Sequence, residues 1–384
     1  MLVEQDQVAG ATTGLAAGLL SLGVQDPLER RLVKATIDGL EALAQKLDAP
    51  SPLNRPGSHV LARTPHETAH LEALARDLKA LGEPTEALTP QAWVQQMQKR
   101  GLQAQSEGLE SVLSIPGDAW ALSTETTNLL VQGAKEHGTE LRQATKVRSL
   151  VWKDQVATGL ELANGERIQA DHVILAMGAW TKPFLEQAGF RLPALAFTTH
   201  AAILSLSEAV DAPIIHDHPG HYYFRPESPT HLLVGNGTDT NPTDPNTFHN
   251  TPDPDFFRNI AKRITTRVPG LKQARLKTAW RGILTATPDR AALAGVHPEA
   301  EGLWVLTGDN GYGFMRGWAL GAILAHKIDP ASPLPPAIPE QALAHTDPGR
   351  FWPDPPESFP ITEGFELAED TPSPAGPTPA HLDH

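Results

Sequence analysis

The chain has 384 residues, a length that suits two domains better than one. Hydrophobic residues make up 40% and charged residues 20%, so the chain can bury a core and is not disordered throughout. It has no cysteine, which excludes disulfides, thiolate metal sites and thiol nucleophiles, and its formal charge of -14 argues against nucleic acid as a partner. No apolar run approaches the roughly 20 residues of a membrane helix and no secretory signal is visible, so we expect a cytoplasmic protein without a transmembrane segment.

The first half of the chain begins with helix signals. Three of the expected helices start with an Asp or Thr followed by proline, which supplies a cap and a first-turn residue. The second also has the capping-box pattern, with Glu67 three residues after Thr64, and Gly82 can close it. Helices are predicted over residues 27–47, 65–81, from 90 onward, and 124–137.

After Gly138 the hydrophobic period changes from helical to alternating. Strands are predicted at residues 141–145, 147–152, 156–162 and 172–177, then in a β-rich region from about 192 to 237. Asn164-Gly165 is a strong hairpin turn, and the continuous apolar run 172–177 suits a strand buried on both faces of a parallel sheet. A helix near 255–268, a strand at 303–307 and a final helix to about 328 complete the body.

Residues 330–384 differ from the body in composition. They hold 14 of the 35 prolines and nine acids against one base, Arg350. Such a segment buries little apolar area, so we expect a mostly disordered tail whose part after Arg350 can be removed without loss of stability.

Three segments carry most of the functional information. The first is a short apolar strand that ends in Glu4, followed by the small residues of segment 10–20. The second is the buried strand that ends at Gly178. The third is the glycine-rich turn 308–315 between a strand and a helix, where backbone N–H groups and the helix dipole favour negative charge.

In this order and spacing, the segments resemble the FAD-dependent D-amino-acid oxidase superfamily, in its branch of glycine oxidase, sarcosine oxidase and dimethylglycine dehydrogenase. The resemblance runs from Met1 to about Phe351. It includes residues 57–62, 222–227, 232–235, 280–284 and 347–351.

The resemblance implies an α/β fold with a Rossmann-like FAD-binding domain interleaved with a β-sheet substrate domain. The expected FAD-binding parts are residues 1–50, 116–188 and 277–329. The expected substrate-domain parts are residues 51–115 and 189–276, and residues 330–384 form the tail.

The resemblance also implies which residues bind FAD. Glu4 is expected to bind the adenosine ribose, and Val147 the adenine through its backbone. Residues expected along the flavin and pyrophosphate are Thr12, Thr13, Ala17, Gly18 and Leu19, with Ala176, Gly178 and Trp180 close to the cofactor. Residues expected around the pyrimidine edge of the ring are Gly308, Asp309, Asn310, Gly311, Tyr312, Gly313, Phe314 and Met315.

Three departures from the family pattern shape these expectations. Met315 stands where some sarcosine oxidases have a lysine, and Thr13-Gly14 where dimethylglycine dehydrogenases have a flavin-linked histidine, so we expect FAD to bind non-covalently. The family's Gly-x-Gly-x-x-Gly motif does not occur, and the acidic residue that follows it by about 20 residues is here residue 4. We therefore expect the true reading frame to start about 25–35 residues upstream, from the same motif spacing.

The implied reaction is hydride transfer from the C–H bond next to the nitrogen of a small amino acid, such as glycine, sarcosine or proline, to flavin, with oxygen or another compound as the final acceptor. The resulting imine is then hydrolysed. Arg281 and Arg316, with Arg225 third, are expected to bind the substrate carboxylate. Tyr223 matches a pocket tyrosine, and His200 or His221 is a candidate for proton transfer. No metal-ligand spacing is present.

Two alternatives remain open from the sequence. In the first, the chain is a non-catalytic remnant that cannot hold FAD. In the second, it is one subunit of a multi-subunit amine dehydrogenase. The oligomeric state is not predicted.

Overall fold

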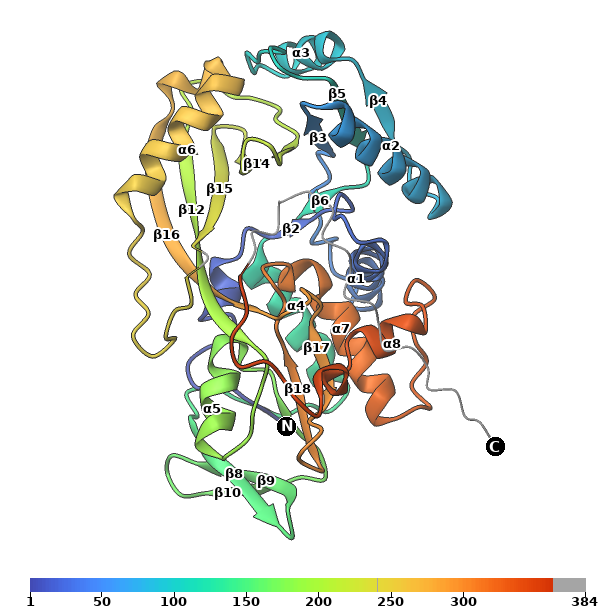
Figure 1. The fold of residues 1–384 in the computed structure, drawn as a ribbon, viewed down its shortest axis with the longest axis vertical. Helices are drawn as coiled ribbons and strands as arrows, with labels where there is room; N and C mark the ends of the chain where they lie inside the picture. The colour runs from blue at the N-terminus through green and yellow to red at the C-terminus, as the bar shows by residue number, and fades with distance from the viewer. Residues whose placement is uncertain (240, 362–384) are drawn as a thin grey trace.

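The structure, a computed structural model, describes residues 1–239 and 241–361. It has two halves: one contains a large sheet, and in the other helices surround several small sheets (Figure 1). The two long strands β12 (Leu195–Ser205) and β16 (Arg275–Ala286) run from the first half into the second. The mixed α/β fold expected from the sequence is confirmed.

The large sheet has eight strands in the order β16-β12-β15-β14-β13-β3-β5-β4. Neighbouring strands are antiparallel except β13 and β3, which are parallel. The other six strands are β15 (His231–Asp239), β14 (Tyr222–Ser228), β13 (Ile214–Asp217), β3 (Ser58–Ala62), β5 (Ser111–Ile115) and β4 (Glu86–Leu88). The predicted β-rich region is thus confirmed as four neighbouring strands.

The two faces of this sheet pack against different helices, because side chains alternate along a strand. The face that carries Leu61 and Ile215 packs against α3 and α6. The face that carries Val60 and Ile214 packs against α1 and α2 and borders the other half of the molecule. The helices are α1 (Pro27–Lys46), α2 (Pro65–Ala80), α3 (Pro90–Lys99) and α6 (Pro254–Arg267).

The helix starts follow the local sequence signals. Asp26 accepts hydrogen bonds from the N–H groups of Leu28 and Glu29 at the start of α1. Thr64 and Glu67 form the predicted capping box of α2, and Thr89 caps α3. These side chains satisfy N–H groups that the first helical turn leaves without partners, so the predicted starts are confirmed.

The second half contains several small sheets. The hairpin sheet of β8 (Val147–Lys153), β9 (Val156–Leu162) and β10 (Arg167–Gln169) turns at Gly165, whose φ is 88°. β2 (Leu19–Leu20) pairs with β6 (Ala119–Trp120). The helices here are α4 (Ser123–Glu136), α5 (Thr181–Gln187), α7 (Gly313–Ile328) and α8 (Gln341–His345), besides α1.

The parallel strands of this half lie in two separate pieces. β1 (Leu2–Val3) pairs with β7 (Leu141–Arg142), and β11 (Val173–Leu175) pairs with β18 (Leu303–Thr307), which in turn pairs with β17 (Leu293–Val296). Among the described residues, no strand joins the two pieces.

The prediction that the strand at 172–177 is buried on both faces is wrong, because His172, Ile174 and Ala176 on one face are exposed. Val173 and Leu175 are buried, but Ile174 between them is 46% exposed. Ile174 lines the cavity described below, so this face of β11 is open.

The prediction of a mostly disordered tail is wrong for residues 330–361. Ile338 and Ala342 pack against α7, and Arg350 binds the Asp289 carboxylate at 2.7 Å. Ile361 packs against Phe197 at the far end of the segment. Apolar residues spaced among the prolines hold this segment on the body, which the overall composition does not reveal. Residues 362–384 lie outside the described residues.

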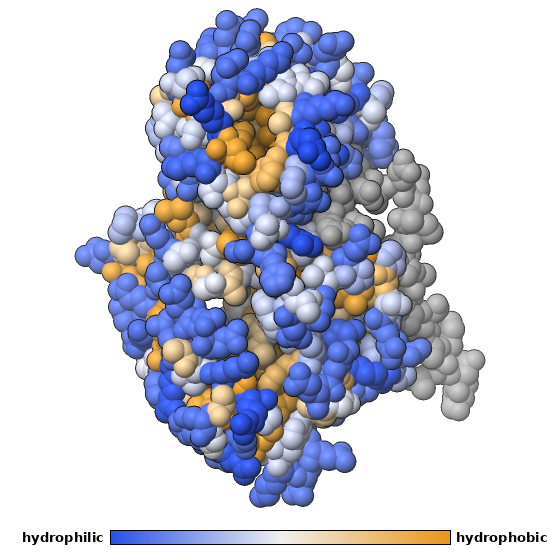
Figure 2. Space-filling model, turned by 90° about the vertical axis from the view of Figure 1, so that its left-hand side faces the viewer, coloured by the Kyte–Doolittle hydropathy of each residue, from blue (hydrophilic) through white to orange (hydrophobic). Residues whose placement is uncertain are grey.

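The surface on the side of β16 and α6 is mainly hydrophilic, with apolar side chains gathered in hollows (Figure 2). Within the described part of the chain, no helix is both long enough and apolar enough to cross a membrane.

Candidate active site

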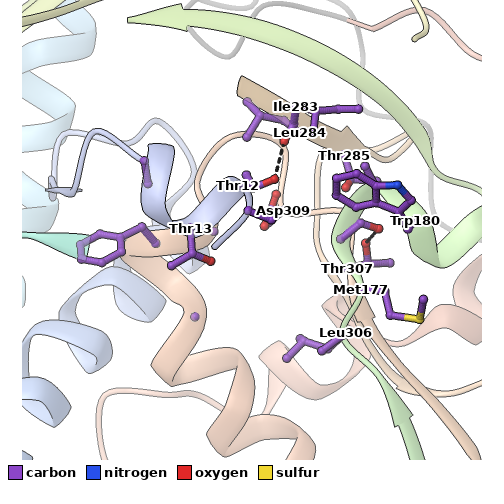
Figure 3. A pocket seen from close by; sticks show the side chains of 18 of the residues that line it. Thr12, Thr13, Met177, Trp180, Ile283, Leu284, Thr285, Leu306, Thr307 and Asp309 are labelled. Atoms are coloured by element: carbon purple, nitrogen blue, oxygen red, sulfur yellow. Dashed lines mark hydrogen bonds between the residues drawn. The ribbon is translucent and has the colours of Figure 1, made fainter. Parts of the chain in front are cut away.

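A cavity of about 1700 Å³ lies between the large sheet and the small sheets. Its wall comes from both halves: the cavity-side face of the large sheet, the edges of β1 and β11, and the first turn of α7. Figure 3 shows the region where these elements meet. There Thr12, on the short 3-10 helix η1 (Thr12–Leu15), donates its hydroxyl to the carbonyl oxygen of Ile283 at 2.9 Å and joins η1 to β16.

Of the residues predicted to bind FAD, all except Gly308 line this cavity. The structure therefore brings together segments that are more than 300 residues apart in the sequence, from Glu4 after β1 to Met315 in α7. Which atom of a ligand each residue contacts stays a prediction.

The loop before α7 has the geometry expected of a cradle for an electron-rich group. The N-cap residue Tyr312 makes no side-chain capping bond, so the first N–H groups of α7 are not capped by it. Gly311 has a φ of 86°, which favours glycine. A Cβ on Gly313 would lie 2.1 Å from the Asp309 carboxylate, so only glycine fits there without a shift.

The cavity fits a dinucleotide cofactor in size and in lining. Its volume exceeds the roughly 300–1,000 Å³ of common small-ligand pockets. Small residues line its β11 side, where Gly178 has a φ of 53° and open space around a Cβ position. Lys146 and Arg148 flank Val147 at the β8 end and offer positive charge for phosphate.

Arg281, predicted to bind a substrate carboxylate, does not line the cavity. Its neighbours Trp280 and Gly282 do, and side chains alternate between faces along a strand. Arg281 pairs in register with His200, and its guanidinium lies 6.0 Å from the ring of Phe248. The pleat of β16 therefore turns Arg281 to the opposite face of the sheet.

Arg316, the second predicted carboxylate ligand, is 1% exposed and also lies outside the cavity wall. It forms a buried ion pair with Glu29 and donates a hydrogen bond to the Asp309 carbonyl. Burial raises the pKa of Glu29, but Arg316 and the hydrogen bond from His345 overcome this and hold it at about 2. Arg316 thus joins α7 to α1, and its charge is used inside the protein.

Arg225, the third candidate, holds the protein chain. Its Nε donates to the carbonyl of Ala17 at 2.5 Å, and its Nη1 to Glu227 at 2.6 Å. Its guanidinium also lies 4.2 Å from the centre of the Trp120 ring. Arg225 therefore fixes the position of the segment that carries Ala17, Gly18 and Leu19, and its hydrogen bonds are used within the protein.

Tyr223 lines the cavity as predicted, within a row of residues across the large sheet. In register, His216 pairs with Tyr223, Tyr223 with Gly235, Gly235 with Ala201, and Ala201 with Trp280. A Cβ on Gly235 would lie 2.1 Å from the Tyr223 ring, so the ring lies over this glycine. Burial raises the pKa of Tyr223 to about 12, which keeps its hydroxyl protonated.

His216 and His218 of this wall are uncharged at neutral pH. Burial lowers the pKa of His216 to about 3 and that of His218 to about 4. Of the predicted histidines, His200 is among the lining residues, but its ring stacks on Phe256 of α6 at 5.0 Å, on the opposite face of the sheet. His221 does not line the cavity.

Sequence reasoning missed many residues of the wall, among them His216, His218, Trp280 and Arg290. Trp280 lies inside segment 280–284 of the resemblance, but alternation along β16 was needed to select Trp280 over Arg281. His216 lies on β13 and His218 directly after it, and their rings stack at 5.9 Å, as expected for alternate residues on one face.

The chain is similar in sequence to known proteins over most of its length. The family described as "FAD dependent oxidoreductase" matches residues 1–327. A glycine oxidase of Geobacillus kaustophilus is 24% identical over 85% of this chain and 86% of its own length. The mouse mitochondrial pyruvate dehydrogenase phosphatase regulatory subunit is also 24% identical over 85% of this chain, but the match spans only 38% of that protein.

Among solved structures, L-proline dehydrogenase from P. horikoshii has the same fold, with a TM-score of 0.80, 21% identity, and coverage of 91% of this chain and 90% of that one. The family match extends over most of the chain and includes nearly all of the cavity wall. The chain therefore belongs to the family of FAD-dependent oxidoreductases, enzymes whose cofactor is FAD.

Proposed function

We propose that the protein oxidises the C–N bond of a small amino acid or N-methyl amino acid, such as glycine, sarcosine or proline, in the cavity between its two halves. The observation that carries the proposal is the single cavity that joins the predicted FAD residues to the neutral aromatic row of the large sheet. Glycine oxidase and L-proline dehydrogenase, two similar proteins, both act on amino acids by name.

When bound, FAD supplies the acceptor for the two electrons of the C–H bond next to the substrate nitrogen. The protein's own residues orient the substrate. Tyr223, protonated because burial raises its pKa to about 12, offers a hydroxyl hydrogen bond from the sheet side. Its ring and that of Trp280 give the substrate an apolar surface that excludes water. The released imine is hydrolysed by water.

The test uses the purified full chain. A flavin absorbance spectrum, or a rise in melting temperature on addition of FAD, is expected, followed by reduction of a dye acceptor with glycine, sarcosine or proline. Oxygen consumption measured beside dye reduction separates an oxidase from a dehydrogenase. A chain that neither binds added FAD nor oxidises any of these amino acids would contradict the proposal.

A second candidate is a non-catalytic regulatory or binding role. One observation that favours it is that β1 and β11 lie in separate sheets among the described residues, so that no strand closes the cavity between them. The other is the name of the mouse relative, a regulatory subunit. FAD binding without turnover of any amino acid would support this candidate.

A further inference from the structure

An amino acid brings a carboxylate into the cavity, and a carboxylate that loses its hydration needs a cation. The arginines that the sequence suggests for this task are engaged elsewhere. Arg316 is paired with Glu29, Arg225 holds Ala17 and Glu227, and Arg281 lies on the other face of the sheet. The cation must therefore come from another part of the wall.

Arginine and lysine side chains occur in the described wall at two places. Lys146 and Arg148 lie on the β8 side, where Arg148 is 3.5 Å from Glu161. Arg290 lies in the turn between β16 and β17. Among the described lining residues it is the one arginine or lysine outside the β8 segment.

The turn that carries Arg290 is fixed to the loop before α7. Asn310 holds Thr287 by two hydrogen bonds, one from the Thr287 N–H to Oδ1 at 2.9 Å and one from Nδ2 to Thr287 Oγ1 at 3.0 Å. The N–H of Arg290 in turn donates to the Thr287 carbonyl at 3.3 Å. These bonds place the start of the Arg290 side chain beside the glycine cradle of α7.

Asp289, the acidic neighbour of Arg290 in the sequence, does not neutralise the Arg290 guanidinium. Asp289 binds Arg350 through both carboxylate oxygens, at 2.7 and 3.0 Å. Arg290 and Tyr312 both line the cavity there. Burial raises the pKa of the Tyr312 hydroxyl, and the charge and hydrogen bond of Arg290, together with the charge of Arg316, oppose this shift. A guanidinium and a phenol hydroxyl thus stand together in the wall.

The wall across the large sheet has a different character. His216 is 5% exposed, and its Nε2 has no hydrogen-bond partner among the described residues. With Tyr223 and Trp280 it forms an aromatic surface without formal charge. Besides the basic residues on the β8 side, the cavity therefore has a cationic group near α7, and its large-sheet wall is neutral and hydrogen-bonding.

We propose that Arg290, assisted by the Tyr312 hydroxyl, binds the substrate carboxylate, while the row of His216, Tyr223 and Trp280 receives the rest of the molecule. The proposal rests on the proposed function and names its substrate class. One guanidinium matches one carboxylate through two parallel hydrogen bonds. The site thus selects amino acids with a single carboxylate over dicarboxylates and over amines without one.

The test measures binding of pyrrole-2-carboxylate to the FAD-loaded protein by calorimetry. This probe carries a carboxylate but no saturated C–H beside its nitrogen, so it binds without turnover. Arg290→Gln should weaken binding by about 10- to 100-fold, and Arg290→Lys by less, because a lysine keeps the charge but loses the fork. In kinetics, Arg290→Gln should raise KM for glycine or proline more than it lowers kcat.

Two other variants serve as comparisons. Arg258→Gln, on the exposed side of α6, should bind the probe as the wild type does. Equal binding by Arg290→Gln and the wild type, loss of binding in Arg281→Gln instead, or no binding by the wild type would each overturn the proposal. If Arg290→Gln weakens the probe but the wild type oxidises no amino acid, the proposed function fails and the assignment of Arg290 stands.

Discussion

The large sheet and the small sheets around the cavity are held together in different ways. In the large sheet, eight strands pair side by side, so many backbone hydrogen bonds share the stability. In the other half, β1 and β11 lie in separate pieces, and buried polar contacts link the helices and loops between them. Removing one partner of a buried pair leaves an uncompensated charge, which costs far more than one hydrogen bond of a ladder. Loss of one partner of a buried charge pair should therefore lower stability more than loss of a single ladder hydrogen bond.

The largest effect is expected for Arg316→Ala. Glu29 would stay buried without its cation, and the free energy of unfolding should fall by about 3–5 kcal/mol in urea denaturation. The double variant Glu29→Leu with Arg316→Met removes both charges and should recover much of this loss. A stable Arg316→Ala protein with weakened substrate binding would instead favour the role that the sequence suggests for Arg316.

A second strong effect is expected at Asp118, which joins the two halves. Its buried carboxylate accepts hydrogen bonds from Ser21 Oγ and Ser58 Oγ, both at 2.6 Å, and from the Leu22 N–H at 2.7 Å. Burial raises its pKa from 3.8 to about 6, although these bonds oppose the shift. The folded protein thus binds this proton more tightly than the unfolded chain does.

Because the pKa of Asp118 is higher in the folded protein than in the unfolded chain, the free energy of unfolding depends on pH. The stability contributed by Asp118 is fully present below about pH 4 and is lost as pH rises to about 6, by about 3 kcal/mol. Asp118→Asn should remove this part of the pH dependence when urea denaturation is compared between pH 4 and 7. The exposed variant Asp38→Asn should leave it in place. An unchanged pH profile in Asp118→Asn would show that the carboxyl titrates near its ordinary value.

The tail gives an intermediate effect, because it fastens the strands that connect the two halves. Ile361 is 7% exposed and packs against Phe197 of β12 and Ala286 of β16. Ile361→Ala should lower the free energy of unfolding by about 2 kcal/mol. Ser358→Ala, at an exposed position of the same segment, should change it by less than about 0.5 kcal/mol. Equal stability of the two variants would mean that residue 361 does not pack on the body.

Local signals in the sequence predicted the local structure well. The caps at Asp26 and Thr64 are decided by neighbouring residues, and both helices start where the pattern indicates. The cavity wall was also largely predictable, because the resemblance aligns whole segments such as 308–315. The partners of single charges were not predictable, since Arg316 and Glu29 lie 287 residues apart.

The face of the sheet on which a side chain of a long strand lies was equally hard to predict from the sequence. β12 changes register between Thr199 and His200 and again, against β16, between Ile203 and Leu204. Such bulges reset which residues share a face, so alternation counted from one end does not hold to the other. The sequence favoured Arg281 because a guanidinium suits a carboxylate, while the structure turns Trp280 to the cavity.

The smallest effect is expected at the open face of β11, where the comparison of the two halves is tested most directly. Ile174 is 46% exposed, while its neighbour Val173 is 3% exposed and packs in a core with Leu185 and Leu303. Ile174→Lys should change the free energy of unfolding by less than about 0.5 kcal/mol and reduce aggregation, since a charge protects an exposed apolar strand. Val173→Lys should cost several times more, because it buries a charge without a partner. If urea denaturation shows equal losses for the two variants, the Ile174 face is covered in solution, and the separation of β1 from β11 is closed by another polypeptide segment.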